Sequence, residues 1–147
     1  MDVRKFAKEI VATLPQIHLE FVRRQPNIIM KGKLTFPQMI ILEILRAQNE
    51  CKMGDLSRML GVTKSAVTGL TDRLIKVGLA RRRRSKEDRR VVKIKLTPKG
   101  SSLSKQINEY KLRMIASLFS NISPKERTVY LGILRKLEKN IRVKNKT

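Results

Sequence analysis

Two short helical segments, a turn and two strands follow one another between residues 54 and 96, and this order restricts the fold more than any other feature of the chain. Residues 54–60 and 64–77 are predicted to be helices, the second with Val67, Leu70, Leu74 and Val77 at the three- and four-residue spacing of an inward face. Thr63 stands at an N-cap position and Gly78 at a C-cap position. The pattern predicts a helix-turn-helix.

A strongly basic hairpin follows the second helix. Residues 79–82 and 91–96 are predicted to be strands, with Val92, Ile94 and Leu96 on one face of the second strand. Residues 81–90 hold seven basic and two acidic side chains, a net charge of +5. Like charges at this density repel one another unless an anion lies nearby, so the hairpin is interpreted as a DNA-binding wing.

The charge of the whole chain favours the same partner. The 147 residues include 34 Lys and Arg but only 12 Asp and Glu, for a formal charge of +22, which indicates a polyanion such as double-stranded DNA. A hydrophobic content of 41% still supports a globular core. The predicted second helix carries Lys64, Ser65, Thr68 and Arg73 on its polar face, a face suited to a major groove.

Helices are predicted on both sides of this segment. Residues 3–21 form an amphipathic stripe in which Pro15 predicts either a kink or two short helices. After a break at 25–34, Thr35 and Gln38 occupy capping-box positions of a helix running to about Gln48, with a turn at 49–52. Further helices are predicted after Pro98 and after Pro124, the latter with a capping box at Ser123 and Glu126.

The apolar stripes outside the helix-turn-helix exceed what a small winged helix can bury, which predicts a homodimer. The residues expected at the dimer interface are Phe6, Ile10, Leu14, Ile17, Ile133, Leu137 and Ile141.

The sequence resembles the MarR (multiple antibiotic resistance regulator) family. Residues 88–97 (DRRVVKIKLT) fit the family's wing signature D-x-R-x-x-x-apolar-x-L-T, and residues 55–81 (DLSRMLGVTKSAVTGLTDRLIKVGLAR) resemble its helix-turn-helix. The resemblance implies a homodimer with intertwined terminal helices and two winged helices on a pseudo-palindromic operator. It also implies a wing arginine at Arg90, an aspartate at Asp88 that orients it, and, in many members, a small phenolic or lipophilic effector.

The fold class expected is therefore mainly α with a small β-wing. Residues 33–97 are assigned to a winged helix-turn-helix, and residues 1–32 and 98–147 to a helical dimerisation region. Together, the residue patterns and the resemblance assign DNA contacts to Thr35, Gln38, Thr63, Lys64, Ser65, Thr68, Arg73, Arg84, Lys86, Asp88, Arg89 and Arg90.

The function expected is that of a cytoplasmic, sequence-specific repressor released by a small-molecule effector, whose pocket is not assigned. Two alternatives stay open: a basic architectural protein that coats DNA without sequence preference, and a thiol sensor using Cys51, whose pKa the adjacent Lys52 would lower. Neither an enzyme nor a cofactor is expected. One cysteine and His18 cannot form a closed zinc site, and the longest apolar run is too short to span a membrane.

Overall fold

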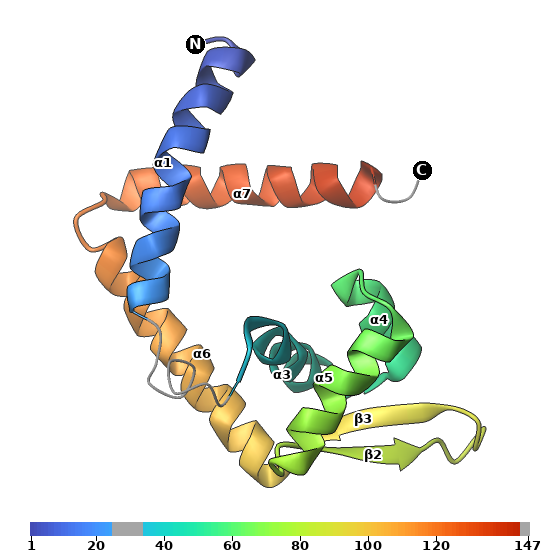
Figure 1. The fold of residues 1–147 in the computed structure, drawn as a ribbon. Helices are drawn as coiled ribbons and strands as arrows, with labels where there is room; N and C mark the ends of the chain where they lie inside the picture. The colour runs from blue at the N-terminus through green and yellow to red at the C-terminus, as the bar shows by residue number, and fades with distance from the viewer. Residues whose placement is uncertain (25–33, 145–147) are drawn as a thin grey trace. The chain divides into compact units, whose positions relative to one another are not determined.

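The computed structural model describes residues 1–24 and 34–144, and most of the break predicted at 25–34 lies outside them. The predicted class, mainly helical with a small sheet, is confirmed (Figure 1). The elements in chain order are α1 (Val3–Arg23), α3 (Phe36–Gln48), β1 (Glu50–Lys52), α4 (Met53–Leu60), α5 (Lys64–Lys76), β2 (Ala80–Arg84), β3 (Val92–Leu96), α6 (Pro98–Leu118) and α7 (Pro124–Lys144). They form two compact units, Met1–Tyr110 and Lys111–Thr147, with the boundary inside α6. The assignment of residues 1–32 and 98–147 to dimerisation stays a prediction.

The first helix continues through its proline. Asp2 caps α1 by accepting hydrogen bonds from the backbone N–H groups of Arg4 (2.7 Å) and Lys5 (3.1 Å). Pro15 lies inside this one helix, so of the two predicted alternatives, a kink or two short helices, the structure excludes the second. A proline leaves the carbonyl four residues earlier without a helical partner. That carbonyl belongs to Val11, which is exposed, so water can satisfy it at little cost.

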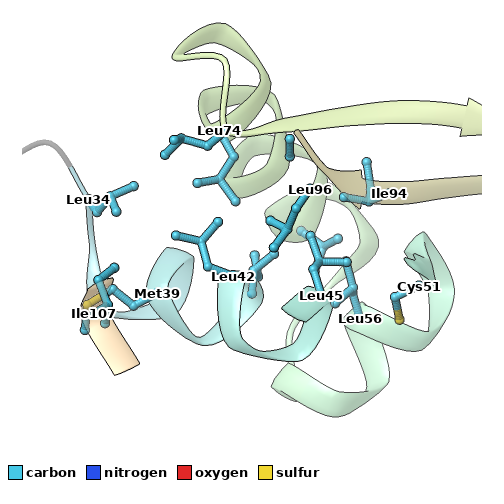
Figure 2. Close-up of a cluster of buried hydrophobic side chains, with 14 residues drawn as sticks. Leu34, Met39, Leu42, Leu45, Cys51, Leu56, Leu74, Ile94, Leu96 and Ile107 are labelled. Atoms are coloured by element: carbon cyan, nitrogen blue, oxygen red, sulfur yellow. The ribbon is translucent and has the colours of Figure 1, made fainter. Parts of the chain in front are cut away.

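The hydrophobic core of the first unit lies between α3, α4, α5 and the sheet (Figure 2). Leu42 of α3, Leu56 of α4, Leu74 of α5 and Ile94 of β3 are completely buried, and Ile107 of α6 joins them. These contacts hold the helix-turn-helix rigidly on the sheet and leave the opposite side of α5 exposed.

Position 77 does not belong to this core, although the helical period predicts it there. The helix ends at Lys76, so Val77 is the C-cap and is 40% exposed. Thr71 is fully buried instead, and its hydroxyl donates to the backbone carbonyls of Val67 (2.9 Å) and Thr68 (3.0 Å). Bonding within the helix leaves the buried hydroxyl satisfied.

The sheet has a third strand that the sequence analysis missed. Residues 50–52, within the predicted turn, form β1, and the strand order is β1-β3-β2 with both pairs antiparallel. Ile94 lies opposite Cys51 on one side and opposite Arg82 on the other. Three residues are too few to show the alternation of a strand, and only pairing with β3 creates it.

The start of β2 is tied closely to the start of α6. The hydroxyl of Thr97 donates to the carbonyl of Gly78 (2.6 Å) and accepts from the N–H of Gly100 (3.0 Å). A Cβ at Gly100 would lie 1.8 Å from the carbonyl oxygen of Leu79, so only glycine allows this approach. Gly78 adopts φ +76° and ends α5 as predicted.

In the second unit, the predicted capping box at the start of α7 is confirmed. Ser123 N–H donates to the Glu126 carboxylate (3.0 Å), and Glu126 N–H donates to the Ser123 hydroxyl (3.3 Å). The Ser123 hydroxyl also donates to the Glu126 carboxylate (2.6 Å), and this bond, followed by the bond from the Ser123 N–H, lowers the pKa of Glu126. The rings of Phe119 and Tyr130 lie 5.3 Å apart and fix the turn before the helix.

Candidate nucleic-acid interface

The N-terminal half of α5 presents a polar surface. Thr63 caps the helix by accepting from the N–H of Ala66 (3.1 Å), and Lys64, Ser65 and Thr68 beyond it are all exposed. The Thr68 hydroxyl donates to the carbonyl of Lys64 (2.9 Å), so its oxygen can still accept a hydrogen bond from a ligand. Arg73, further along the helix, is also exposed.

The turn between α4 and α5 is fixed by local bonds. Gly61 adopts a left-handed conformation with φ +63°, and the Ser57 hydroxyl donates to the carbonyl of Val62 (2.7 Å). Because the turn is held at both ends, α5 keeps one orientation on α4, as a helix that enters a groove requires.

At the tip of the β2–β3 hairpin, the two acidic side chains, Glu87 and Asp88, accept hydrogen bonds that stabilise the turn. Ser85 is buried, and its N–H donates to the carbonyl of Val91 (2.9 Å). The hydroxyl of Ser85 donates to the carboxylate of Glu87, a bond that lowers the pKa of Glu87. The Asp88 carboxylate accepts from the backbone N–H of Arg90 (2.9 Å). The resemblance implied that Asp88 orients the side chain of Arg90, whereas the bond in the structure positions its backbone.

The basic residues of the hairpin from Arg82 to Arg90 divide into two groups. Arg82 of β2 pairs with Asp72 of α5, and Arg83 pairs with Glu50 of β1 (3.6 Å). The second group is exposed and forms no ion pair within the part of the chain that the structure describes; it comprises Arg84, Lys86, Arg89 and Arg90. The ion pairs of the first group stabilise the hairpin. The second group, called here the tip cations, is available to bind an anion.

The ion pair between Asp72 and Arg82 joins the exposed helix to the hairpin, and the sequence analysis did not assign it. Glu50, also unassigned, accepts from the ammonium group of Lys93 (2.9 Å), and this bond with nearby positive charge lowers the pKa of Glu50. No sequence signal identifies these partners, because ten residues or more separate each pair. The sheet register brings Glu50 to its partners, and the packing of α5 on β2 brings Asp72 to Arg82.

One predicted DNA contact is wrong. Gln38 is 1% exposed, its side-chain oxygen accepts from the N–H of Thr35 (2.9 Å), and its amide group donates to the carbonyl of Leu70 (3.4 Å). Gln38 therefore joins α3 to α5 inside the protein and cannot reach a ligand. Thr35, the N-cap residue of the same helix, is exposed.

Cys51 lies in a different environment from the one expected. It is 5% exposed in β1, and burial, followed by the charge of Asp55, raises the pKa of its thiol. The expectation that Lys52 lowers this pKa is wrong. Residues 1–24 and 34–144 contain no group of His, Cys, Asp and Glu side chains that could hold a metal ion. None of the helices within them is long and apolar enough to cross a membrane.

Comparison with known proteins gives a consistent result. Residues 34–92 match the model of the MarR family. The HTH-type transcriptional regulator YpoP of Bacillus subtilis is 30% identical over 95% of this chain and 99% of its own.

Solved structures agree with that relationship. A MarR family protein from Bacillus stearothermophilus has a TM-score of 0.81 and 29% identity over 97% of this chain and 99% of its own. Bordetella bronchiseptica BpsR, whose DNA binding is regulated by 6-hydroxynicotinic acid, has a TM-score of 0.68 and 27% identity over 90% of this chain and 98% of its own. Together with the exposed helix α5 and the basic hairpin, these matches show that the chain belongs to the MarR family and is a DNA-binding transcriptional regulator.

Proposed function

We propose that the chain is a homodimeric repressor that binds a pseudo-palindromic operator and is released by a small-molecule effector. The tip cations are the observation that carries the proposal, because they extend the polar surface of α5 with charge that no described side chain neutralises. In this arrangement α5 enters the major groove and the hairpin reaches the adjacent minor groove. The residues proposed to contact DNA are Thr35, Thr63, Lys64, Ser65, Thr68, Arg73, Arg84, Lys86, Arg89 and Arg90, with Asp88 shaping the turn.

The exposed apolar residues of α1 and α7 support a dimer. Phe6 and Leu14 of α1 are 54% and 52% exposed, and Leu137 of α7 is 52% exposed. Ile10, Ile17, Ile133 and Ile141 are exposed as well. Helical stripes of this kind are stable in water when a second copy covers them, and two-fold symmetry would place two α5 helices on one face of DNA.

Specific binding is the property that separates this proposal from a DNA-coating protein. Phosphate contacts alone provide no sequence choice, so an architectural protein would bind all duplexes about equally at a given salt concentration. We expect fluorescence anisotropy at 150 mM salt, on a duplex selected from a random pool, to give an affinity on the order of 1000-fold above that for a scrambled duplex. A ratio near one would favour the architectural function.

A small phenolic or lipophilic effector is proposed to weaken operator binding, a proposal supported by the regulation of BpsR by 6-hydroxynicotinic acid. The thiol-sensor alternative is less well supported, because Cys51 is buried and its pKa is raised. Adding a panel of aromatic acids and lipophilic compounds to the operator complex tests the effector. Adding hydrogen peroxide to the same complex tests the thiol sensor.

A further inference from the structure

A pocket of about 270 Å³ lies at the base of the β2–β3 hairpin, at the opposite end of the strands from the tip cations. Three basic side chains from three different elements line it: Arg46 of α3, Arg81 of β2 and Lys95 of β3. The proposed operator contacts use none of the three, so the pocket is unexplained by DNA binding.

The sheet register and the packing of α3 bring these cations together. Arg81 and Lys95 are directly paired across the antiparallel strands, so their side chains leave the sheet on the same face. Arg46 lies near the end of α3, and its guanidinium group donates to the side-chain oxygen of Asn108 on α6 (3.4 Å). Each cation is therefore placed by a different part of the fold.

The charge of the pocket is not balanced from within. Among the described residues that line it, none is acidic. Glu50 lies opposite Lys95 on β1 and its charge acts on Lys95 through space, but its carboxylate is bonded to Lys93 (2.9 Å) and paired with Arg83 (3.6 Å), so one negative charge is shared among three cations. Three positive side chains around one cavity repel one another, and a bound anion relieves that repulsion.

The rest of the lining restricts the ligand. Asn49 and Ser101 add polar groups, while Leu45, Leu96 and Pro98 form an apolar wall. Pro98 also begins the 21-residue helix α6, whose N-terminal end is positive and favours an anion. The volume lies just below the range of about 300–1,000 Å³ typical of ligand pockets, so the ligand is compact.

We propose that this pocket binds a small organic dianion of the phosphate monoester class. A monoanion would leave two of the three positive charges without a counter-charge, whereas a dianion with several oxygens can accept from all three side chains. A free ligand is favoured over a DNA phosphate because the three cations surround a small pocket with an apolar wall, a shape that fits a compact molecule better than a continuous DNA backbone. Binding of the dianion does not depend on the dimer, the operator or the effector proposed above.

The test is a titration of the full chain with inorganic phosphate. The titration is monitored by ¹H–¹⁵N NMR at constant ionic strength and at a pH where the phosphate dianion predominates. The backbone amides of Asn49, Thr97 and Ser101 are expected to shift and to saturate together. Acetate, a monoanion, should bind at least about tenfold more weakly. Uniform, non-saturating shifts at all basic residues, or equal affinities for the two anions, would overturn the proposal.

Two variants and one control locate the site. Lys95→Gln and Arg46→Gln should each weaken phosphate binding by about tenfold, because each removes a charged hydrogen-bond donor. Lys105→Gln makes the same charge change on an exposed position of α6 outside the pocket and should leave the affinity unchanged. Equal effects of Lys95→Gln and Lys105→Gln would refute the site even if Arg46→Gln disturbed the packing of α3. Displacement of phosphate from these amides by operator duplex at fixed ionic strength would assign the pocket to the DNA backbone and overturn the free-ligand proposal.

Discussion

Replacing Asp88 tests whether geometry or charge governs the hairpin tip. The carboxylate accepts one hydrogen bond from the backbone N–H of Arg90 (2.9 Å), and the Asp88 carbonyl accepts from Val91 N–H (3.0 Å), so the residue shapes the turn that carries Arg90. Asp88→Ala deletes the carboxylate acceptor and one negative charge. Asp88→Asn deletes the charge but keeps an acceptor in the same place, which makes the two variants a matched pair.

The two effects have opposite signs and different sizes. Loss of a side-chain-to-backbone bond of this kind costs about 1 kcal/mol, here as misplacement of Arg90 in the bound wing. Removal of an exposed negative charge next to DNA gains only about 0.15 kcal/mol per phosphate at a separation near 10 Å in screened water. We therefore expect Asp88→Ala to weaken operator binding by about threefold to fivefold per wing, and Asp88→Asn to bind as tightly as the unaltered protein or slightly more tightly.

Fluorescence anisotropy with an operator duplex at two salt concentrations measures both variants. A salt slope that is unchanged in Asp88→Ala would place the loss in geometry and not in counterion release. If Asp88→Ala and Asp88→Asn bound DNA more tightly to the same degree, the hydrogen bond to Arg90 would have no positioning role and the reasoning would be refuted.

Four further predictions address the fold, the DNA contacts and the thiol. Gly100→Ala should lower the free energy of unfolding by about 1–3 kcal/mol in urea titrations, because the new Cβ would meet the carbonyl of Leu79. Gly69→Ala, whose Cβ would meet no other atom, should be neutral or stabilising, and equal stabilities of the two variants would contradict the close approach at Gly100. Arg84→Ala should reduce the salt slope of DNA binding by about one unit per wing without changing the preferred sequence, and an unchanged slope would show that the tip does not contact phosphates. Thr68→Ala should change the difference in binding free energy between bases at one operator position by about 1–3 kcal/mol, measured on a panel of single-base operator variants. A uniform loss of affinity for all these variants would place Thr68 outside the groove. Burial raises the pKa of the Cys51 thiol, so the folded protein forms the thiolate at a higher pH than the unfolded chain does. Ellman's reagent should therefore react far more slowly at pH 8 in buffer than in urea, and equal rates would show an accessible thiolate.

Local patterns predicted most of the helices correctly, because the interactions that begin and end a helix span only a few residues. Thr63 reaches Ala66, Ser123 reaches Glu126, and Gly78 needs only its own backbone freedom. At Pro15 the same local reasoning left two alternatives open, a kink or two short helices, and solvent exposure around Val11 allowed one helix to continue.

The candidate site was predicted in part for the same reason. The tip cations follow one another in the chain, so charge counting finds them. Gln38 was assigned to the DNA surface from its position at a helix start, yet that start packs against α5 and buries it beside Leu70. Burial depends on which face of α3 meets a neighbour, and a capping pattern contains no information about that face.

The sequence by itself determined the order of the helices, their caps, the basic hairpin and, through the wing signature, the family. Only the tertiary structure decided that residues 50–52 pair with β3, that Cys51 is buried with a raised pKa, and that Asp72 braces Arg82. It also gathered Arg46, Arg81 and Lys95 around one pocket. The physical reason is distance along the chain: caps join residues three or four apart, whereas strand pairing and this cluster join residues as many as 49 positions apart, from Arg46 to Lys95, and their meeting depends on the packing of the whole unit.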